Sequence, residues 1–298
     1  MCSFFSIHHI SPNTSALKIN AYFCHVKIKV FVMVKDFELK DCKYTIHDVV
    51  SCFDVDSNIR MKPVAFMNIA QEMATRAADP LGFGYNEMLK KNMAWVLSRM
   101  HFVFMDTPLW NDEIKVTTWH KGIGGPFFLR DFLISGADGS QKVVGTSSWV
   151  VLDLEKRAMV RMNDILDMIP DDSACHENAI ETPAPKVMMP RSAEPRLVRS
   201  EVLGYSDTDM NAHTNNARYI QHAMNCFDYA ELQKLSVAEV FITFAHETRP
   251  GETLDLYIYD EPLAEPKLSM NGKPIVRSTI VEGKVGDMQA FCTRIIFN

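Results

Sequence analysis

One short pattern occurs twice in this chain, and the repeat restricts the fold more than any other feature. Residues 53–66 read FDVDSNIRMKPVAF and residues 205–219 read YSDTDMNAHTNNARY, so that Asp56 aligns with Asp209 at an offset of 153 residues (209 − 56). Each copy is followed by apolar residues at the i, i+3, i+4, i+7 spacing of a helix. A repeat of this kind predicts two similar structural units within one chain.

The likeness continues beyond the helical segments. VLSRMHFVFMDTPLWNDEIKV (96–116) resembles VAEVFITFAHETRPGETLDL (237–256), with Phe104 opposite Phe244 at an offset of 140 residues (244 − 104). The decrease in offset places an insertion, PLGFGYNEMLKKN, between the helix and the strand of the first half.

Strand-like segments then follow in both halves. The turn sequences ADGS (137–140) and Asn271-Gly272 separate alternating apolar and polar residues. Each half therefore reads as a short loop, one long helix and several antiparallel strands. A sheet with a helix packed across its face buries the apolar surface of both. We predict an α+β fold of two such units, paired within the chain as a pseudo-dimer.

Composition suggests where the units begin and end. Residues 1–35 contain no Asp, Glu or Arg and lack the unbroken apolar centre of a secretory signal. We read them as a disordered leader or an upstream extension, with Met33 as an alternative start. Residues 36–165 form the first unit and 198–298 the second. Between them, 166–197 is rich in Pro, Ser and charge and reads as a linker.

The overall charge and the cysteines exclude several classes of protein. A net charge of −6 and a pI near 5.9 argue against a nucleic-acid binder, which needs a basic face. The sequence contains no apolar run long enough to predict a membrane span. Seven scattered cysteines without a CxxC pair argue against a disulfide framework or a zinc ribbon, and for a reducing compartment.

The second copy of the repeat begins like a calcium loop, with alternating oxygen-bearing side chains from Asp207 to Asn211. An EF-hand loop also needs Gly at its sixth position and Glu at its twelfth. Here those positions are Ala212 and Arg218. We therefore reject calcium and expect the acidic residues to cap the helix that follows.

The two copies differ at two positions that are able to carry chemistry. His213 and Glu247 stand where the first copy has an arginine and a threonine. We expect Glu247 to act as a general base on water. Asn211 and His213 would donate hydrogen bonds to a carbonyl or oxyanion near the helix N-terminus, and Asp209 would orient the water or His213. The alternative is four polar residues in two unrelated caps and turns.

These motifs together resemble those of the acyl-acyl-carrier-protein (acyl-ACP) thioesterases of the plant-plastid and bacterial fatty-acyl type. The matching strings are FDVDSNIRMKPVAFMNIAQE, GFGY (82–85), AWVLSRMHF (94–102), TWHKGIGGPFFLRDF (118–132), DTDMNAHTNNARYI (207–220) and the FxxExxxGE stretch (244–252). The resemblance covers about residues 36–298. It implies a double hotdog fold that hydrolyses the thioester between a fatty acyl chain and the phosphopantetheine arm of acyl-carrier protein, without metal or organic cofactor.

The resemblance also implies roles for individual residues. The family's catalytic residues map onto Asp209, Asn211, His213 and Glu247. Plant members follow the glutamate with a cysteine, whereas this chain has Thr248. The change favours water activated by a carboxylate over a covalent thiol mechanism.

By the same resemblance the first half holds the acyl chain, with Met67, Ala70, Met73 and Trp95 as candidate pocket residues. Ordinary core packing is the alternative for all four. The stretch KVMMPRSAEPRLVRS (186–200) is locally basic, as docking of the acidic carrier protein would require.

Several alternatives stay open at this point. The same residues would suit acyl-CoA hydrolysis, and a hotdog hydratase or dehydratase uses a similar Asp-x-Asn…His cluster on the acyl C2–C3 bond. A non-enzymatic alternative is an acyl-binding or carrier-docking module. We expect a cytoplasmic protein, or a plastid one if residues 1–35 are a transit peptide. Further homodimerisation and the preferred acyl chain are left open.

Overall fold

The computed structural model describes residues 37–166, 169 and 173–298. Our predictions for residues 1–35, including the alternative start at Met33, therefore fall outside the described residues. Within the described ranges, no helix is long and apolar enough to cross a membrane.

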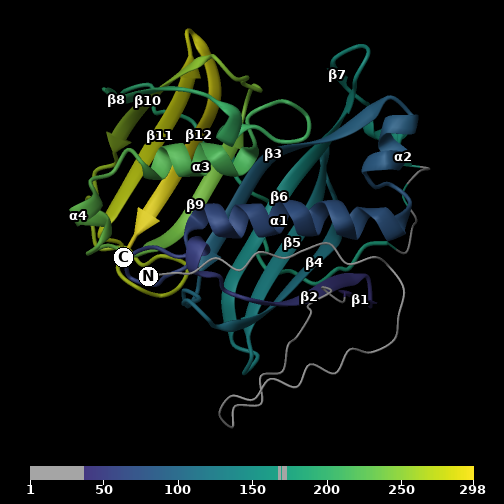
Figure 1. Ribbon diagram of the computed structural model, residues 1–298, viewed down its shortest axis with the longest axis horizontal. Helices are drawn as coiled ribbons and strands as arrows, with labels where there is room; N and C mark the ends of the chain where they lie inside the picture. Colours follow the sequence, from purple (N-terminus) through teal and green to yellow (C-terminus); the bar gives the residue numbers. More distant parts are fainter. Residues whose placement is uncertain (1–36, 167–168, 170–172) are drawn as a thin grey trace, which may run out of the picture. The chain divides into compact units, whose positions relative to one another are not determined.

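The framework of the described chain is one antiparallel sheet of twelve strands (Figure 1). Its strands run in the order β1-β2-β4-β5-β6-β3-β9-β12-β11-β10-β8, and β7 pairs with β6 alone. The strands are β1 (Phe37–Lys40), β2 (Lys43–Val49), β3 (Met93–Phe104), β4 (Glu113–Gly124), β5 (Phe127–Gly136), β6 (Gln141–Asp153), β7 (Ala158–Met159), β8 (Arg196–Val202), β9 (Val237–Phe244), β10 (Thr253–Asp260), β11 (Arg277–Val285) and β12 (Met288–Phe297).

The order of the strands is similar on the two sides of the β3–β9 pair. Moving outward from β3, the sheet contains β6, β5, β4 and β2; moving outward from β9, it contains β12, β11, β10 and β8. β3 and β9 pair antiparallel, with Arg99 opposite Thr243 and Val103 opposite Glu239. Two similar sets of strands therefore meet edge to edge, each built from one copy of the sequence repeat.

Two helices lie across the same face of the sheet, one over each half (Figure 1). α1 (Pro63–Ala78) begins with proline, whose fixed φ suits the first helical position. α3 (Asn216–Met224) is capped by Asn215, whose side chain accepts the N–H of Ala217 at 2.9 Å. The predicted insertion forms a short helix, α2 (Tyr85–Lys90), between α1 and β3.

The second helix is shorter than its apolar pattern predicted. α3 ends at Met224, and a single turn, α4 (Tyr229–Leu232), follows after a break. Asp228 causes the restart because its carboxylate accepts the N–H groups of Ala230 and Glu231, as an N-cap does.

Aromatic side chains fill the core between α1 and the sheet. Phe66 of α1 packs on Phe102 with ring centroids 4.6 Å apart and meets Phe132 edge-on at 6.3 Å. Gly145 on β6 lies beneath this contact, where an added Cβ would meet the Phe66 ring at 3.1 Å. The glycine therefore allows α1 to approach the sheet closely.

Parts of the described stretch 173–195, within the segment read as a linker (166–197), pack against the other face of the sheet. Asp131, fully buried on the face opposite α1, accepts the N–H of Ala179 at 2.8 Å. Val187 is also buried and donates its N–H to Thr243 Oγ1 at 2.8 Å. The composition of this segment gave no sign of this packing, but an apolar sheet face has to be covered, and this segment covers part of it.

Candidate active site

The two copies of the repeat form loops with the same backbone hydrogen bonds. In each loop the aspartate donates its N–H to the carbonyl four residues later, at 2.8 Å from Asp56 and 3.0 Å from Asp209. In each, the same aspartate accepts the N–H two residues later at 2.8 Å. Both loops place the next residue in the left-handed region, with φ 57° at Ile59 and 59° at Ala212. The repeat therefore encodes one loop geometry twice.

This geometry defines what Asp209 does in the folded chain. Its Oδ1 accepts the N–H of Asn211 at 2.8 Å, as Asp56 does for Asn58 in the first loop. We predicted that Asp209 orients water or His213. That role stays a prediction. The hydrogen bond described for its carboxylate lies within its own loop, where Asn211 is exposed and His213 is half-buried.

The structure brings His213 and Glu247 together. Glu247 lies three residues beyond the end of β9, and its Oε2 is 3.5 Å from His213 Nδ1. Thr214 donates its N–H to the carbonyl of Thr248 at 2.9 Å, which holds the two segments side by side. Because each residue of the pair is next to one of these threonines, the backbone contact positions the imidazole beside the carboxylate.

Two arginines complete the surroundings of this carboxylate. Arg157 Nη2 donates to Glu247 Oε1 at 2.7 Å, and Arg249 Nη2 donates to the same oxygen at 3.3 Å. Arg249 Nη2 is also 3.5 Å from His213 Nε2. Partial burial raises the pKa of Glu247, but the Arg157 hydrogen bond and the electrostatic effects of the neighbouring His213 and Arg157 outweigh it and lower that pKa below its ordinary value. Our sequence reasoning did not find either arginine.

Asn211 differs from its counterpart in the first loop. Asn58 donates its side-chain N–H to the carbonyl of Gln233 at 2.8 Å. Asn211 is exposed beside His213. An exposed amide on the same loop as His213 is able to donate to a substrate oxygen.

Thr248, which stands where plant relatives are expected to have cysteine, faces the interior. It is fully buried, and its Oγ1 donates to Thr214 Oγ1 at 2.7 Å and lies 2.9 Å from the Tyr219 hydroxyl. The helix cysteine, Cys226, is half-buried, and burial raises the pKa of its thiol to about 12. That thiol stays protonated at neutral pH, so it is a poor nucleophile.

A buried cluster beneath the site was not predicted. The imidazole of His222 on α3 lies between Glu201 Oε2 at 2.6 Å and Asp207 Oδ1 at 3.0 Å. It thereby ties the start of the second loop to the helix. The repeat contained the signal, because at the offset of 153 residues His222 aligns with Ile69 and Glu201 with Asp48.

Three of the four predicted pocket residues lie together. Met67, Ala70 and Met73 are buried on α1 against the sheet of the first half. Trp95 belongs to a neighbouring cluster, where its Nε1 donates to the carbonyl of Phe83 at 2.8 Å and its ring meets Phe128 edge-on at 5.0 Å.

Polar groups border this second cluster. His120 packs beside Phe83 and Phe128. Burial, together with the charge of Arg130, lowers the pKa of His120 to about 4, so its imidazole is neutral at pH 7. Burial also lowers the pKa of Arg130, to about 10. The interior of the first half therefore combines apolar side chains with a neutral imidazole and the buried Arg130 cation.

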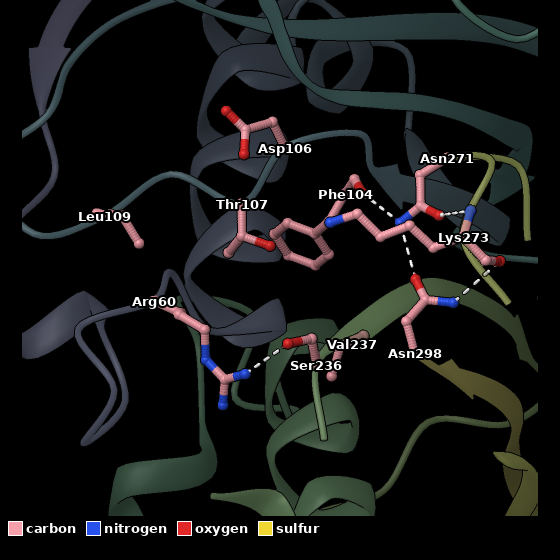
Figure 2. A pocket seen from close by; sticks show the side chains of 10 residues that line it. All are labelled: Arg60, Phe104, Asp106, Thr107, Leu109, Ser236, Val237, Asn271, Lys273 and Asn298. Carbon is pink, nitrogen blue, oxygen red and sulfur yellow. Dashed lines mark hydrogen bonds between the residues drawn. The ribbon is translucent and has the colours of Figure 1, made fainter. Parts of the chain in front are cut away.

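The loop of the first half borders a cavity of about 220 Å³, which Thr107 lines at the position aligned with Glu247 (Figure 2). Arg60 points across it toward Ser236, to which its Nη1 donates at 2.6 Å. The same guanidinium donates to Asp56 and to the carbonyls of Leu232 and Leu235. Its donors are thus used in joining the two halves.

Comparison with known families agrees with this architecture. The family model for the acyl-ACP thioesterase N-terminal domain matches residues 41–169, and the model for the C-terminal domain of the same family matches residues 198–281. Together they account for more than half of the chain. It belongs to the acyl-ACP thioesterase family.

Individual members of the family are only moderately similar in sequence. A chloroplastic palmitoyl-acyl carrier protein thioesterase of Gossypium hirsutum is 30% identical over 163 residues, which is 52% of this chain and 40% of that protein. A chloroplastic acyl-[acyl-carrier-protein] hydrolase of Cuphea viscosissima is 25% identical over 223 residues, covering 68% and 52%. The chain spans about half the length, or less, of these curated relatives.

Solved structures of family members share the fold. An acyl-ACP thioesterase of Bacteroides thetaiotaomicron superimposes with a TM-score of 0.72 at 24% identity, covering 86% of this chain and 98% of that one. The 12:0-ACP thioesterase of Umbellularia californica gives a TM-score of 0.72 at 17% identity, covering 86% and 94%. The predicted α+β double hotdog is therefore confirmed, with one set of strands in each half and one helix, α1 or α3, across its face.

Proposed function

We propose that this protein hydrolyses the thioester of fatty acyl-acyl-carrier protein and releases a free fatty acid. Membership of the acyl-ACP thioesterase family supports the reaction class. The observation that carries the proposal for this chain is the pairing of His213 with Glu247 at 3.5 Å, on a loop that also exposes Asn211. The other copy of the repeat has no carboxylate at the position of Glu247.

The reaction follows from the two oxygens of Glu247. Oε1 accepts both arginine hydrogen bonds, whereas Oε2 faces His213, so we assign proton transfer to Oε2. Water attacks the carbonyl carbon of the thioester while Oε2 accepts one of its protons. Asn211 and His213 donate hydrogen bonds to the oxyanion that forms. The C–S bond then breaks, and the proton on Glu247 passes to the departing sulfur to give a thiol and a carboxylic acid.

In this scheme Asp209 is a positioning residue. Its hydrogen bond to the Asn211 N–H maintains the loop on which Asn211 and His213 lie. Removal of its charge is expected to disturb both donors at once, without affecting the carboxylate that accepts the proton.

We propose that the acyl chain enters the first half beside Met67, Ala70, Met73 and Trp95. The methionines support this because flexible thioethers adapt to ligands of varied shape. The partner is acyl-carrier protein, which presents the acyl group on its phosphopantetheine arm. The reaction needs no cofactor, and the two hotdog units, which we place at residues 36–165 and 198–298, act as a pseudo-dimer.

We retain a cytoplasmic location as our proposal. The two curated relatives described above are chloroplast proteins by name, which supports the plastid alternative. Expression with a C-terminal fluorescent tag in the source cells would distinguish the two compartments.

The function is tested by following thiol release from acyl-carrier proteins that differ in chain length and saturation, and from the matching acyl-CoAs. We expect release from carrier-protein substrates by the wild type and a large loss in Glu247→Gln. No release from any substrate would contradict the proposal. Faster release from CoA would make the protein an acyl-CoA thioesterase. Addition or loss of water at the acyl C2–C3 bond, surviving Glu247→Gln but not Asp209→Asn, would indicate a hydratase or dehydratase.

A further inference from the structure

One side chain of the first half reaches the candidate site of the second half. Arg157 lies in the turn between β6 and β7, 90 residues before Glu247 in the sequence, and its Nη2 donates to Glu247 Oε1 at 2.7 Å. This distance is shorter than the 3.3 Å from Arg249, which lies on the same segment as the glutamate. A short contact between charged groups makes the stronger hydrogen bond.

The turn that carries Arg157 is well defined. Asp153 Oδ1 accepts the N–H groups of Glu155 at 3.0 Å and Lys156 at 2.9 Å. β7 then pairs back onto β6, with Ala158 opposite Asp153. The guanidinium is therefore presented from an ordered hairpin, although its side chain is 69% exposed.

Arg157 also has an unfavourable backbone conformation. Its φ of 49° lies in the left-handed region, which residues other than Gly, Asn and Asp seldom adopt. Glycine would suit this turn position better. The presence of arginine there consequently suggests a requirement for its side chain rather than for the turn itself.

The contacts around Glu247 come from three segments. Arg157 approaches from the β6–β7 turn, Arg249 from the segment of Glu247 itself, and His213 from the loop before α3. Both arginines contact Oε1, which directs Oε2 toward the imidazole. If Arg157 is removed, the shorter of the two contacts that select this orientation is lost.

We propose that Arg157 is a positioning residue that the first hotdog unit supplies to the site of the second, orienting Glu247 with Oε2 toward His213. The inference rests on the proposed function in assigning proton transfer to Oε2. It adds a requirement for the first unit in catalysis, beyond holding the acyl chain. The chemical role belongs to Glu247, and Arg157 acts through it.

The test uses Arg157→Gly, which removes the guanidinium while relieving the strained backbone. We expect kcat/KM for acyl-carrier protein to fall about five- to tenfold, mainly through kcat, because the carboxylate is no longer held in one orientation. Arg157→Lys should recover part of the loss, and so should methylguanidinium added to Arg157→Gly. A role limited to forming the turn predicts the opposite, since glycine should preserve or improve the turn.

Lys156→Ala provides the matched control. Lys156 lies in the same turn and is 77% exposed, and its ammonium pairs with Asp153, not with Glu247. We expect its kcat/KM to stay within about twofold of the wild type. Equal kcat/KM values for Arg157→Gly, Lys156→Ala and the wild type would overturn the inference.

A second measurement does not depend on turnover. The pKa of Glu247, lowered in the wild type, should rise in Arg157→Gly because a favourable contact with the charged carboxylate is lost. A ¹³C-carboxyl NMR titration, with the Glu247 signal assigned from Glu247→Gln, reports this directly. An unchanged titration would overturn the inference even if the wild type hydrolyses thioesters, whereas a shifted titration in an inactive wild type would contradict only the proposed reaction.

Discussion

The loop before α1 and the loop before α3 make the same backbone hydrogen bonds, yet they contribute different chemistry. In the first, Arg60 donates to Asp56 and to two carbonyls of the other half. In the second, His213 takes the place of the arginine and faces Glu247. The difference lies in one side chain of the loop and one beyond the end of the neighbouring strand.

The comparison shows how a duplicated fold can carry a single site. An aspartate and an asparagine maintain the loop in both copies, so the backbone does not distinguish them. Arg60, at the fifth position of the first loop, joins the two halves, and its guanidinium donors are used in these hydrogen bonds. Histidine at the same position is too short to make those contacts, and it is left available beside a carboxylate.

The largest effect is expected at Glu247, three residues beyond the end of β9. Its counterpart in the first half is Thr107, three residues beyond the end of β3. Glu247→Gln should lower kcat about 1000-fold, because loss of a general base typically costs between two and four orders of magnitude. Thr107→Val, at the aligned position of the first half, should leave kcat within about twofold. Steady-state thiol release measures both. Comparable losses in the two variants would contradict a site confined to the second half.

The asparagines provide the next test. Asn211→Ala should lower kcat about 100-fold, as expected for removal of an oxyanion donor. Asn58→Ala removes an exposed hydrogen bond to Gln233 and should leave turnover within about twofold. The same assay applies. A small effect of Asn211→Ala would mean that Asn211 does not donate to the oxyanion and that His213 is the donor.

Arg60 tests the structural role of the first loop. Arg60→Met should lower the free energy of unfolding by about 2–3 kcal/mol, since it removes the guanidinium that bonds Asp56 and two half-buried carbonyls of the other half. Urea denaturation followed by circular dichroism measures the loss. Arg76→Met, which breaks an exposed i,i+4 pair with Glu72, should change the unfolding free energy by only about 0.5 kcal/mol. Equal effects would argue against a tie between the halves.

The smallest effect is expected in substrate choice. Met73 and Cys226 occupy aligned positions on α1 and beyond α3, at the offset of 153 residues. Met73→Ala should change the ratio of kcat/KM between longer and shorter acyl chains about tenfold, because a methylene in an apolar pocket is worth at least that much. Cys226→Ala should leave the ratio within about twofold. The acyl-carrier-protein panel measures both, and an unchanged ratio in Met73→Ala would indicate ordinary core packing.

Much of the fold followed from patterns along the chain. The aligned copies at Asp56 and Asp209 predicted the two units, and the change of offset located the insertion that forms α2. Helical length was less predictable, because the apolar pattern continues past Met224 while Asp228 starts a new cap. The apolar periodicity favours one continuous helix, whereas Asp228 favours a new helix start. The periodicity reports only the first preference.

The packing of the linker segment was unpredictable for a related reason. A stretch rich in proline and charge resembles a solvated connection, and composition does not show which sheet face lies nearby. In the folded chain the amides of this stretch donate to Asp131 and Thr243, and Val187 is buried. The way in which this stretch packs on the sheet depends on the tertiary arrangement of both halves.

The candidate site could be predicted where its residues differ between the two copies of the sequence repeat. His213 and Glu247 stood out because the repeat supplied an internal reference, and the same reference would have revealed His222 opposite Ile69. Arg249 lies two residues from Glu247, but no spacing rule marks an irregular segment beyond a strand. The exact role of Asp209 required its hydrogen bond to Asn211.

Repetition and periodicity are local properties, and they were enough to determine two helix-on-sheet units and an asymmetric pair of loops. Only the tertiary structure decided what surrounds the carboxylate. Arg157 contacts Glu247 because β3 and β9 join the halves edge to edge and the β6–β7 turn then reaches across. A contact between residues 90 positions apart, made by an exposed side chain outside the repeat, has no signal in the order of residues. It arises from the geometry of the joined sheet.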